Sequence, residues 1–499
     1  MSTKTIIRAG RLVDIDSHRA EPADILVVGD TIEAVGAPGM EAPADAEALD
    51  ASDRLMHPGL INGHTHSHGN LSKGMGDRWT LELLLAAAPW ISGNRQLEEK
   101  YLSTLIGAIE MLEKGCTAAY DLFFEFSTPS IEGLDAVARG YKDAGMRAVV
   151  APMVADRTFY EAIPGLMDYL PPSLQEAVTA MRLAPYETSI ANMRAALKGW
   201  THDTDRVRLA VAPTIPMHCT DEFMVACRDL AREFGVGIHS HVSESKVQAV
   251  YAIKRYGKSP TAHLDELGLL GPDFVVAHGV WLDDDDMRRL ADHGASVSHN
   301  PGSNMRLGNG IADSVRMLEL GVNLAIGTDG ASCSDNQNMY EAMRLASFAS
   351  KVRCPDWQDW IRTEQVLTAA TVGSARALGF EKLGRIEPGY KADIVFLDLG
   401  ATNWLPLNDA TNQIVHTEEG TGVDKVMVGG RIVVDHGRIV GVDKRKLMQD
   451  VEVARSRLAE VNAPNKELYH SLENVVGAFC PGLAHTPHHI QRFGHPCHG

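Results

Sequence analysis

The sequence predicts an α/β fold, a (β/α)8 barrel that carries a small β-sandwich built from both chain ends. Short apolar runs typical of buried strands alternate with helical stretches through the middle of the chain, which predicts a parallel sheet. About eight such units over roughly 320 residues favour a closed barrel over an open sheet. Strand-like segments with glycine and aspartate turns occur at both ends of the chain and predict the sandwich.

Individual segments support the barrel. Residues 97–113 repeat apolar side chains on one helical face, and residues 221–233 do the same behind Asp221 and Glu222, whose charges favour a helix N-terminus. The aspartate run 283–286 is interpreted as the solvated first turn of another helix. Strand-like runs occupy residues 236–241, 274–279, 295–300 and 323–330. Polar residues end these runs, at the barrel face where parallel barrels place active sites.

The predicted domain boundaries divide the chain into four parts. Residues 1–57 and 384–445 are expected to form the two parts of the β-sandwich, and residues 58–383 the barrel. Residues 446–499 are expected to form a C-terminal helix and an irregular tail. The last stretch, 485–499, holds five histidines and one cysteine, and we interpret it as a loosely ordered terminus. Adventitious metal binding and contact with a neighbouring subunit are the alternatives.

Composition narrows the functional class. The 499 residues carry a formal charge of -18, which argues against a nucleic-acid partner because phosphate binding needs a basic face. No stretch approaches the roughly 20 apolar residues of a membrane span. The seven cysteines are scattered, with no CxxC, which indicates free thiols in a reducing compartment. We therefore expect a cytoplasmic protein with a small-molecule substrate and no membrane partner.

The polar residues at the strand ends have the pattern of a metal centre. His64 and His66 are two apart, so they point the same way from an extended strand. Such a pair alone is a weak signal, because two surface histidines give the same pattern. The later strand ends add His241 with Glu244, then His278, then Asp329. Imidazoles and a carboxylate suit Zn(II), Fe(II) or Mn(II), and the ligands alone do not separate these ions.

With these motifs, the chain resembles the amidohydrolase superfamily, in its branch of aminohydrolases of heteroaromatic bases. That branch includes adenosylhomocysteine/methylthioadenosine, guanine and cytosine deaminases and chloro-triazine hydrolases. The resemblance covers residues 1 to about 445. It is carried by the segments PGLINGHTH, HSHVSES, VVAHGVWL, SHNPGSNMRLGNGIA, AIGTDGAS and LGRIEPGYKADIVFLD.

The resemblance implies one divalent metal, with zinc expected and iron or manganese as alternatives. Its ligands would be His64, His66, His241 and Asp329. Many binuclear relatives carry a carboxylated lysine at the exit of the fourth strand, and residues 207–220 have no lysine there, which favours a single ion. Homo-oligomers are common in the family, and we expect one here.

The resemblance also implies a deaminase mechanism in which a metal-activated water replaces an amino group on a ring carbon. Asp329 would be both ligand and base, His278 would orient the water, and Glu244 would protonate the ring nitrogen and the leaving amine. Glu244 could instead be a carboxylate at a helix N-terminus. The alternatives for the reaction are dechlorination or dealkylamination of a triazine-like ring, or cyclic amide hydrolysis. A non-catalytic scaffold is a remote alternative, because scaffolds lack the metal ligands.

Candidate substrate contacts lie in two other loops. Trp79 and Glu82 follow the first barrel strand, and an aromatic ring there could stack on a planar base or simply pack. Asn304 and Arg306 follow the seventh strand, and Ser332 follows Asp329, each with a turn-shaping role as the alternative.

One segment departs from the family pattern. Nucleoside-type relatives carry a histidine at the fourth-strand exit, where this chain has Thr214 within residues 213–216. This difference argues against an adenosine-type substrate. His218 is nearby, with a surface role as the alternative.

Overall fold

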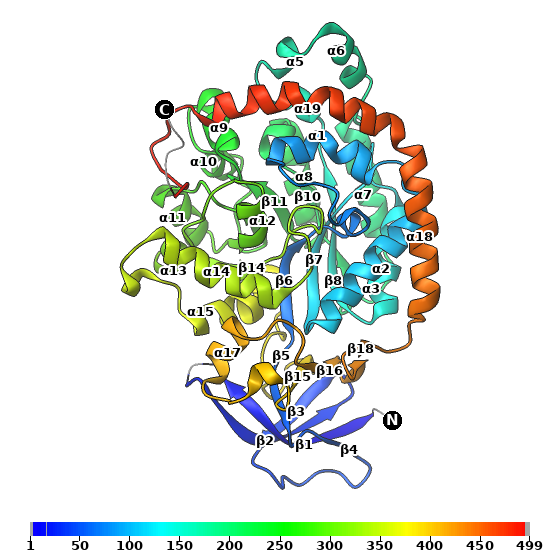
Figure 1. Ribbon diagram of the computed structural model, residues 1–499, viewed down its shortest axis with the longest axis vertical. Coiled ribbons are helices and arrows are strands. Elements are labelled where there is room, and N and C mark those ends of the chain that lie inside the picture. Colours follow the sequence, from blue (N-terminus) through cyan, green and yellow to red (C-terminus); the bar gives the residue numbers. More distant parts are fainter. Residues whose placement is uncertain (1–2, 16, 495–499) are drawn as a thin grey trace.

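The computed structural model describes residues 3–15 and 17–494, and its centre is the predicted (β/α)8 barrel (Figure 1). All the pairings between barrel strands in this described part are parallel. The strands are β6 (Leu60–Thr65), β7 (Cys116–Phe124), β8 (Arg147–Val154), β9 (Val207–Leu209) with β10 (Ala212–Pro213), β11 (Ile238–Val242), β12 (Phe274–His278), β13 (Ser296–His299) and β14 (Asn323–Ile326). The predicted fold class is confirmed.

The barrel closes at two seams. A parallel bridge between Val211 and Ile238 joins the segment at β10 to β11, and Asp329 N donates to His64 O at 2.9 Å beside β14 and β6. The second seam requires glycine at position 327. A Cβ there would lie 2.4 Å from Asn300 Oδ1 and 2.8 Å from the backbone N and O of His64. Any side chain at Gly327 would therefore push apart the two strands that carry the first and last predicted ligands.

Helices follow the strands and cover the barrel. The helix predicted at 97–113 is α2 (Leu97–Glu113), and the one predicted at 221–233 is α8 (Asp221–Phe234), which Thr220 caps by accepting from Phe223 N. The other helices between the barrel strands and after β14 are α1 (Leu81–Ser92), α3 (Ile131–Ala144), α4 (Phe159–Ala162), α5 (Leu166–Tyr169), α6 (Pro172–Thr179), α7 (Tyr186–Gly199), α9 (Lys246–Tyr256), α10 (Pro260–Glu266), α11 (Asp284–Asp292), α12 (Pro301–Arg306), α13 (Ser314–Glu319), α14 (Met339–Arg353), α15 (Thr363–Thr368) and α16 (Ser374–Ala377).

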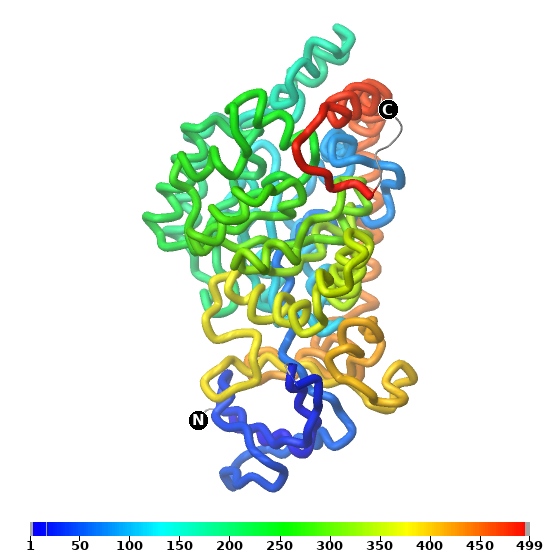
Figure 2. Tube along the Cα trace, turned by 90° about the vertical axis from the view of Figure 1, so that its left-hand side faces the viewer, coloured from blue at the N-terminus to red at the C-terminus, as the bar shows by residue number. Residues whose placement is uncertain are grey.

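Both chain ends contribute to one nine-stranded sheet below the barrel, as predicted (Figures 1 and 2). β5 pairs antiparallel with β15, with Pro58 opposite Ile394, and this pairing joins the two ends. The sheet consists of β1 (Lys4–Asp14), β2 (Arg19–Val28), β3 (Thr31–Gly36), β4 (Glu47–Asp50), β5 (Arg54–Pro58), β15 (Ile394–Asp398), β16 (Val423–Val428), β17 (Arg431–Asp435) and β18 (Arg438–Ile439), with α17 (Ala410–His416) beside it.

The C-terminal part of the chain wraps around the barrel. α18 (Lys444–Val461) runs along its side, and α19 (Ala463–Ala484) crosses the end opposite the sheet (Figure 1). A second buried apolar cluster there joins α19 to α1 and to the segment after β8 that contains α4, α5 and α6. The cluster includes Trp79, Phe159 and Tyr469. Residues 485–494 are irregular, and they pack on the barrel through Arg492 and Phe493. His495, Cys497 and His498 of the histidine-rich tail lie outside the described residues.

None of the helices in the described ranges is both long enough and apolar enough to cross a membrane.

Candidate metal centre

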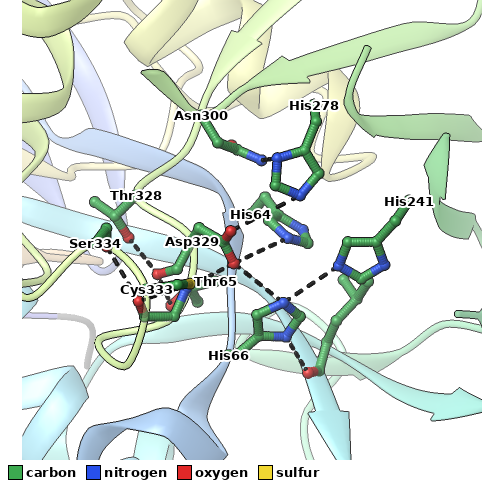
Figure 3. Close-up of polar contacts among 12 residues, drawn as sticks. His64, Thr65, His66, His241, His278, Asn300, Thr328, Asp329, Cys333 and Ser334 are labelled. Carbon is green, nitrogen blue, oxygen red and sulfur yellow. Dashed lines mark hydrogen bonds and ion pairs between the residues drawn. The ribbon is translucent and has the colours of Figure 1, made fainter. Parts of the chain in front are cut away.

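Four predicted ligands converge at the C-terminal end of the barrel strands (Figure 3). Asp329 Oδ1 lies 3.1 Å from His66 Nε2 and 3.4 Å from His64 Nε2. His66 Nε2 lies 3.3 Å from His241 Nε2. These side chains come from β6 and the turn after it, from β11, and from the turn after β14, and all four are buried or nearly so. The ligand atoms of His64, His66 and Asp329 thus lie within 4.8 Å of one another, and His241 adjoins them through His66.

The hydrogen bonds around these ligand atoms fit a bound cation. The Nδ1 atoms of His66 and His241 lie 2.7 Å from the backbone oxygens of Leu122 and Thr214. A carbonyl oxygen only accepts, so each Nδ1 carries the proton and each Nε2 presents a lone pair. Two lone pairs facing each other at 3.3 Å repel unless a cation lies between them. Both ring nitrogens of buried His64 also lack a hydrogen-bond partner. The donor set suits a divalent metal.

His278 stands between two carboxyl groups on the far side of the cluster. Its Nε2 lies 3.7 Å from Glu244 Oε2 and 3.8 Å from Asp329 Oδ2. Its Nδ1 lies 2.8 Å from Asn304 Oδ1 and 3.3 Å from Asn300 Nδ2 (Figure 3). The shorter contact favours a proton on Nδ1, which leaves Nε2 unprotonated in the neutral form. Glu244 Oε1 accepts from Asn309 Nδ2 at 3.0 Å, and Glu244 Oε2 has no partner.

The backbone is strained at two of these residues. His278 has φ 72° and Asp329 has φ 66°, in the left-handed region that side chains other than glycine rarely adopt. Each such residue costs of order 1–3 kcal/mol, and this strain is typical of functional sites. Here it turns the two side chains inward directly after β12 and β14.

The two carboxyl groups have opposite protonation tendencies. Burial, assisted by the charges of Asp329 and Glu82, raises the pKa of Glu244 well above its ordinary value. Burial also acts to raise the pKa of Asp329, but without a metal, hydrogen bonds from protonated His64 and His66 outweigh it and hold this pKa well below the ordinary value, and a bound cation would act in the same direction. Glu244 therefore tends to keep a proton where Asp329 stays charged. Environments that separate two pKa values in this way assign an acid and a base.

Comparison with known proteins identifies the family. A model of the Amidohydrolase family matches residues 55–433 of the chain. The chain belongs to the amidohydrolase family. It is 33% identical over 445 residues to a 5-methylthioadenosine/S-adenosylhomocysteine deaminase of Pyrococcus furiosus, a match that covers 89% of this amidohydrolase and 98% of the relative.

Solved structures agree. An adenosine deaminase from Xanthomonas campestris, solved with bound zinc, has a TM-score of 0.80 at 27% identity and covers 91% of this chain and 98% of its own. Atrazine chlorohydrolase from Arthrobacter aurescens, also solved with zinc, has a TM-score of 0.81 at 24% identity over 90% of this chain and 100% of its own, and it shows the shared fold alone. The predicted family and the predicted deaminase, a hydrolase of carbon–nitrogen bonds, are confirmed.

Three of the predicted substrate contacts, Glu82, Trp79 and Arg306, have contacts with other protein residues. Glu82 is buried, and its Oε1 accepts from Ser245 Oγ at 3.2 Å. Trp79 packs edge-on against Tyr469 of α19, with ring centroids 5.7 Å apart. Arg306 pairs with Asp335 at 2.8 Å. As contacts with substrate, these residues stay predictions.

The other two candidates adjoin His278 and the turn after Asp329. Asn304 holds His278 through its Oδ1, while its Nδ2 has no partner. Ser332 is half-buried, and its Oγ would lie 3.5 Å from a Cβ at Gly330, directly after Asp329. Both also stay predictions as substrate contacts.

Sequence reasoning missed the supporting residues. Asn309 on Glu244 and the Thr214 carbonyl on His241 were not anticipated. The only sequence signal for Asn309 is that it stands between Gly308 and Gly310. For the Thr214 carbonyl there is none, since every residue has a carbonyl. His218 is buried and not at the surface, which rules out that alternative for it.

Proposed function

We propose that this amidohydrolase removes the 6-amino group of adenosine or an adenosine derivative, with release of ammonia. The observation that carries the proposal is the pair of buried carboxyl groups, Glu244 and Asp329, within 4 Å of His278 and beside the histidine cluster. The adenosine-type substrate is supported by the Pyrococcus furiosus relative and by the Xanthomonas campestris structure.

We propose one zinc ion per chain, held by His64, His66, His241 and Asp329. The support is that the ligand atoms of His64, His66 and Asp329 lie within 4.8 Å of one another and that His241 Nε2 lies 3.3 Å from His66 Nε2. Residues 207–220 also have no lysine. His278 is the neighbouring imidazole, and the ligand atoms of His64, His241 and His278 also lie within 4.8 Å of one another. When bound, zinc lowers the pKa of a coordinated water from 15.7 to about 7 and so supplies hydroxide at neutral pH.

The protein residues then handle the protons. Asp329, whose pKa is held low, accepts a proton from the attacking water, and His278 Nε2 accepts a hydrogen bond that orients it. Glu244 Oε2 donates its proton to the ring nitrogen next to the reacting carbon. As the tetrahedral carbon collapses, the amine takes up the proton that Asp329 received and leaves as ammonia. The hydroxyl group on the ring carbon returns its proton to Glu244, and its oxygen stays on the ring as the carbonyl.

The proposed adenosine-type substrate differs from one expectation drawn from the sequence. Thr214 stands where nucleoside-type relatives have histidine, which argued against adenosine. Its carbonyl orients His241 and its Oγ1 lies 3.5 Å from Met153 Sδ, so the position serves the metal centre through its backbone. We propose that buried Glu82 accepts hydrogen bonds from substrate hydroxyls, because its charge acts on Glu244 and its Oε1 contacts Ser245, the residue after Glu244.

We further propose a homo-oligomer in the cytoplasm. All six cysteines in the described ranges are free, which supports a reducing compartment. Phe348, Val352 and Trp357 are 46%, 71% and 69% exposed, and an assembly would cover such side chains. Light scattering of the purified protein tests the oligomer, and a monomer would reject it.

The test of function is ammonia release by zinc-loaded protein from adenosine, 5′-methylthioadenosine, S-adenosylhomocysteine, guanine, cytosine and an amino-triazine. We expect turnover of at least one adenosine derivative. Glu244→Gln should keep zinc but lose deamination by about 10²–10⁴-fold, the range of general acid catalysis. The matched control is Glu132→Gln, on an exposed position of α3. Silence on all adenosine derivatives, or full activity of Glu244→Gln, would reject the proposal.

A further inference from the structure

We infer that Asn309 positions Glu244 for proton transfer and that the C-terminal segment 486–494, here called the strap, holds Asn309 in place. The inference rests on the proposed function, because it requires Glu244 to be the proton donor. Neither Asn309 nor the strap touches the converging ligand atoms, so both act through Glu244.

The first step is the hydrogen bond at the carboxyl group. Asn309 Nδ2 donates to Glu244 Oε1 at 3.0 Å, and both side chains are buried. An amide nitrogen only donates, so Oε1 is the accepting oxygen. The carbonyl oxygen of a carboxyl group accepts more strongly than its hydroxyl oxygen, so this bond favours the proton on Oε2. Oε2 is the oxygen 3.7 Å from His278 Nε2, on the side of the metal centre. Without Asn309, rotation about the soft terminal torsion would let either oxygen carry the proton.

The second step is the loop that carries Asn309. Gly308 has φ 66° and Gly310 has φ 112°, so the asparagine stands between two glycines in backbone conformations that favour glycine. Glycine gives the loop this shape, but it also gives it the most conformational freedom to lose. The Asn309 carbonyl is fixed by Trp281 Nε1, which donates to it at 2.8 Å. The loop therefore depends on contacts from outside it.

The strap supplies those contacts from the other end of the chain. Ile311 N donates to Arg492 O at 2.8 Å. A Cβ on Gly310 would lie only 2.9 Å from that same oxygen, so the strap passes the loop at a distance that only glycine permits. The Phe493 ring packs 5.2 Å from the ring of Trp281.

Arg492 also joins the strap to the loop after β12. Its Nε donates to Val280 O at 2.9 Å and its Nη2 to Leu282 O at 2.7 Å, just beyond His278. Figure 1 shows the strap in red, descending from α19 toward α11. One segment thus connects the loop that follows His278 with the loop that holds Glu244 through Asn309.

The experiment uses full-length, zinc-loaded protein and the substrate found to be active. Asn309→Ala should lower kcat by about 10- to 100-fold, a part of the loss in Glu244→Gln, with KM within threefold and zinc content unchanged. Asn309→Ser keeps a hydroxyl donor and should recover part of kcat.

Arg492→Ala should lower kcat by about 3- to 10-fold, because it loosens the loop without removing Asn309. Its KM and its zinc content should also stay unchanged. Arg455→Ala, on an exposed position of α18, is the matched control.

The outcomes separate this inference from the proposed function. If Glu244→Gln loses deamination while Asn309→Ala turns over within twofold of wild type, the inference fails and the proposed function stands. A loss in Asn309→Ala that comes with zinc loss, or that Asn309→Ser does not relieve, indicates a structural role and also overturns it. If Arg492→Ala equals Arg455→Ala, the strap has no part. Full activity of Glu244→Gln rejects both the proposed function and the inference.

Discussion

Asp329 combines the most roles of any residue in the centre. Its backbone N closes the barrel on His64 O, its Oδ1 faces two imidazoles, and its Oδ2 faces His278. It also adopts a positive φ of 66°. The same short turn therefore links barrel closure, the ligand cluster and the proposed base. A change in its charge alone is the clean way to separate these roles, because asparagine has nearly the same shape.

We predict that Asp329→Asn lowers kcat by about 10³-fold or more and weakens zinc binding, because it removes both an anionic ligand and the base. Zinc content by elemental analysis and ammonia release on the same sample are the measurements. Asp168→Asn, at an exposed position of α5, controls for the loss of one surface carboxylate. Turnover within tenfold of wild type at full zinc content would show that another group is the base.

At this scale the sequence predicted the side chains that end strands. The HxH pair at the end of β6, His241 at the end of β11 with Glu244 just beyond it, and Asp329 after β14 could be found because parallel strand ends meet at one barrel face. The residues that hold them could not. Asn304 in α12 and Asn309 in the loop after it act through contacts with residues 26 and 65 positions away in sequence, to which no local pattern corresponds.

Among the elements, α11 corrects one prediction. The aspartates 283–286 were interpreted as a solvated first turn, but Asp286 is only 2% exposed. It forms a capping box with Asp283, each side chain accepting from the backbone N of the other. Burial, assisted by Asp283 and Asp285, raises the pKa of Asp286 to about 7. Charge patterning located the helix start correctly, but it could not show that α10 packs over it through Ser259, the N-cap residue of that helix.

We predict that Asp286→Asn stabilises the protein increasingly as the pH rises from about 4 to 7. With its raised pKa, folded Asp286 keeps a proton that the unfolded chain has released, so this group's contribution to stability falls across that window. Asparagine does not ionise, and the gain at pH 7 should reach roughly 2–4 kcal/mol. Urea denaturation at pH 5 and 8 measures it, with Asp292→Asn, exposed on the same helix, as control. An equal difference at both pH values would contradict a buried, protonated Asp286.

For the whole molecule, the alternation of strands and helices was enough to predict the barrel, and the β-rich ends were enough to predict that they associate. The exact domain boundaries stay a prediction. The position of α19 could not be predicted, because its apolar face packs on α1 and on the segment of α4 to α6, which lie hundreds of residues earlier in the chain. The contact between sheet and barrel could not be predicted either, because Arg147 and Asp393 are 246 positions apart in the sequence.

That contact is a buried ion pair that joins the two parts of the molecule. Arg147 at the start of β8 donates to both oxygens of Asp393 at 2.9 Å and 3.1 Å, and the two residues are 1% and 3% exposed. Gly429 N also donates to Asp393 at 2.7 Å. Arg147 lies at the end of β8 opposite the metal centre, so its role is stability and not chemistry.

We predict that Arg147→Ala lowers the free energy of unfolding by about 3–5 kcal/mol, because it leaves the Asp393 carboxylate buried without its partner. Urea denaturation of the zinc-loaded protein measures this, and kcat of the folded variant should stay near wild type. Arg385→Ala breaks an exposed pair with Glu387 and should cost about 0–1 kcal/mol. If Arg147→Ala cost no more than Arg385→Ala, the association of sheet and barrel would rest instead on the buried apolar cluster that contains side chains of both parts.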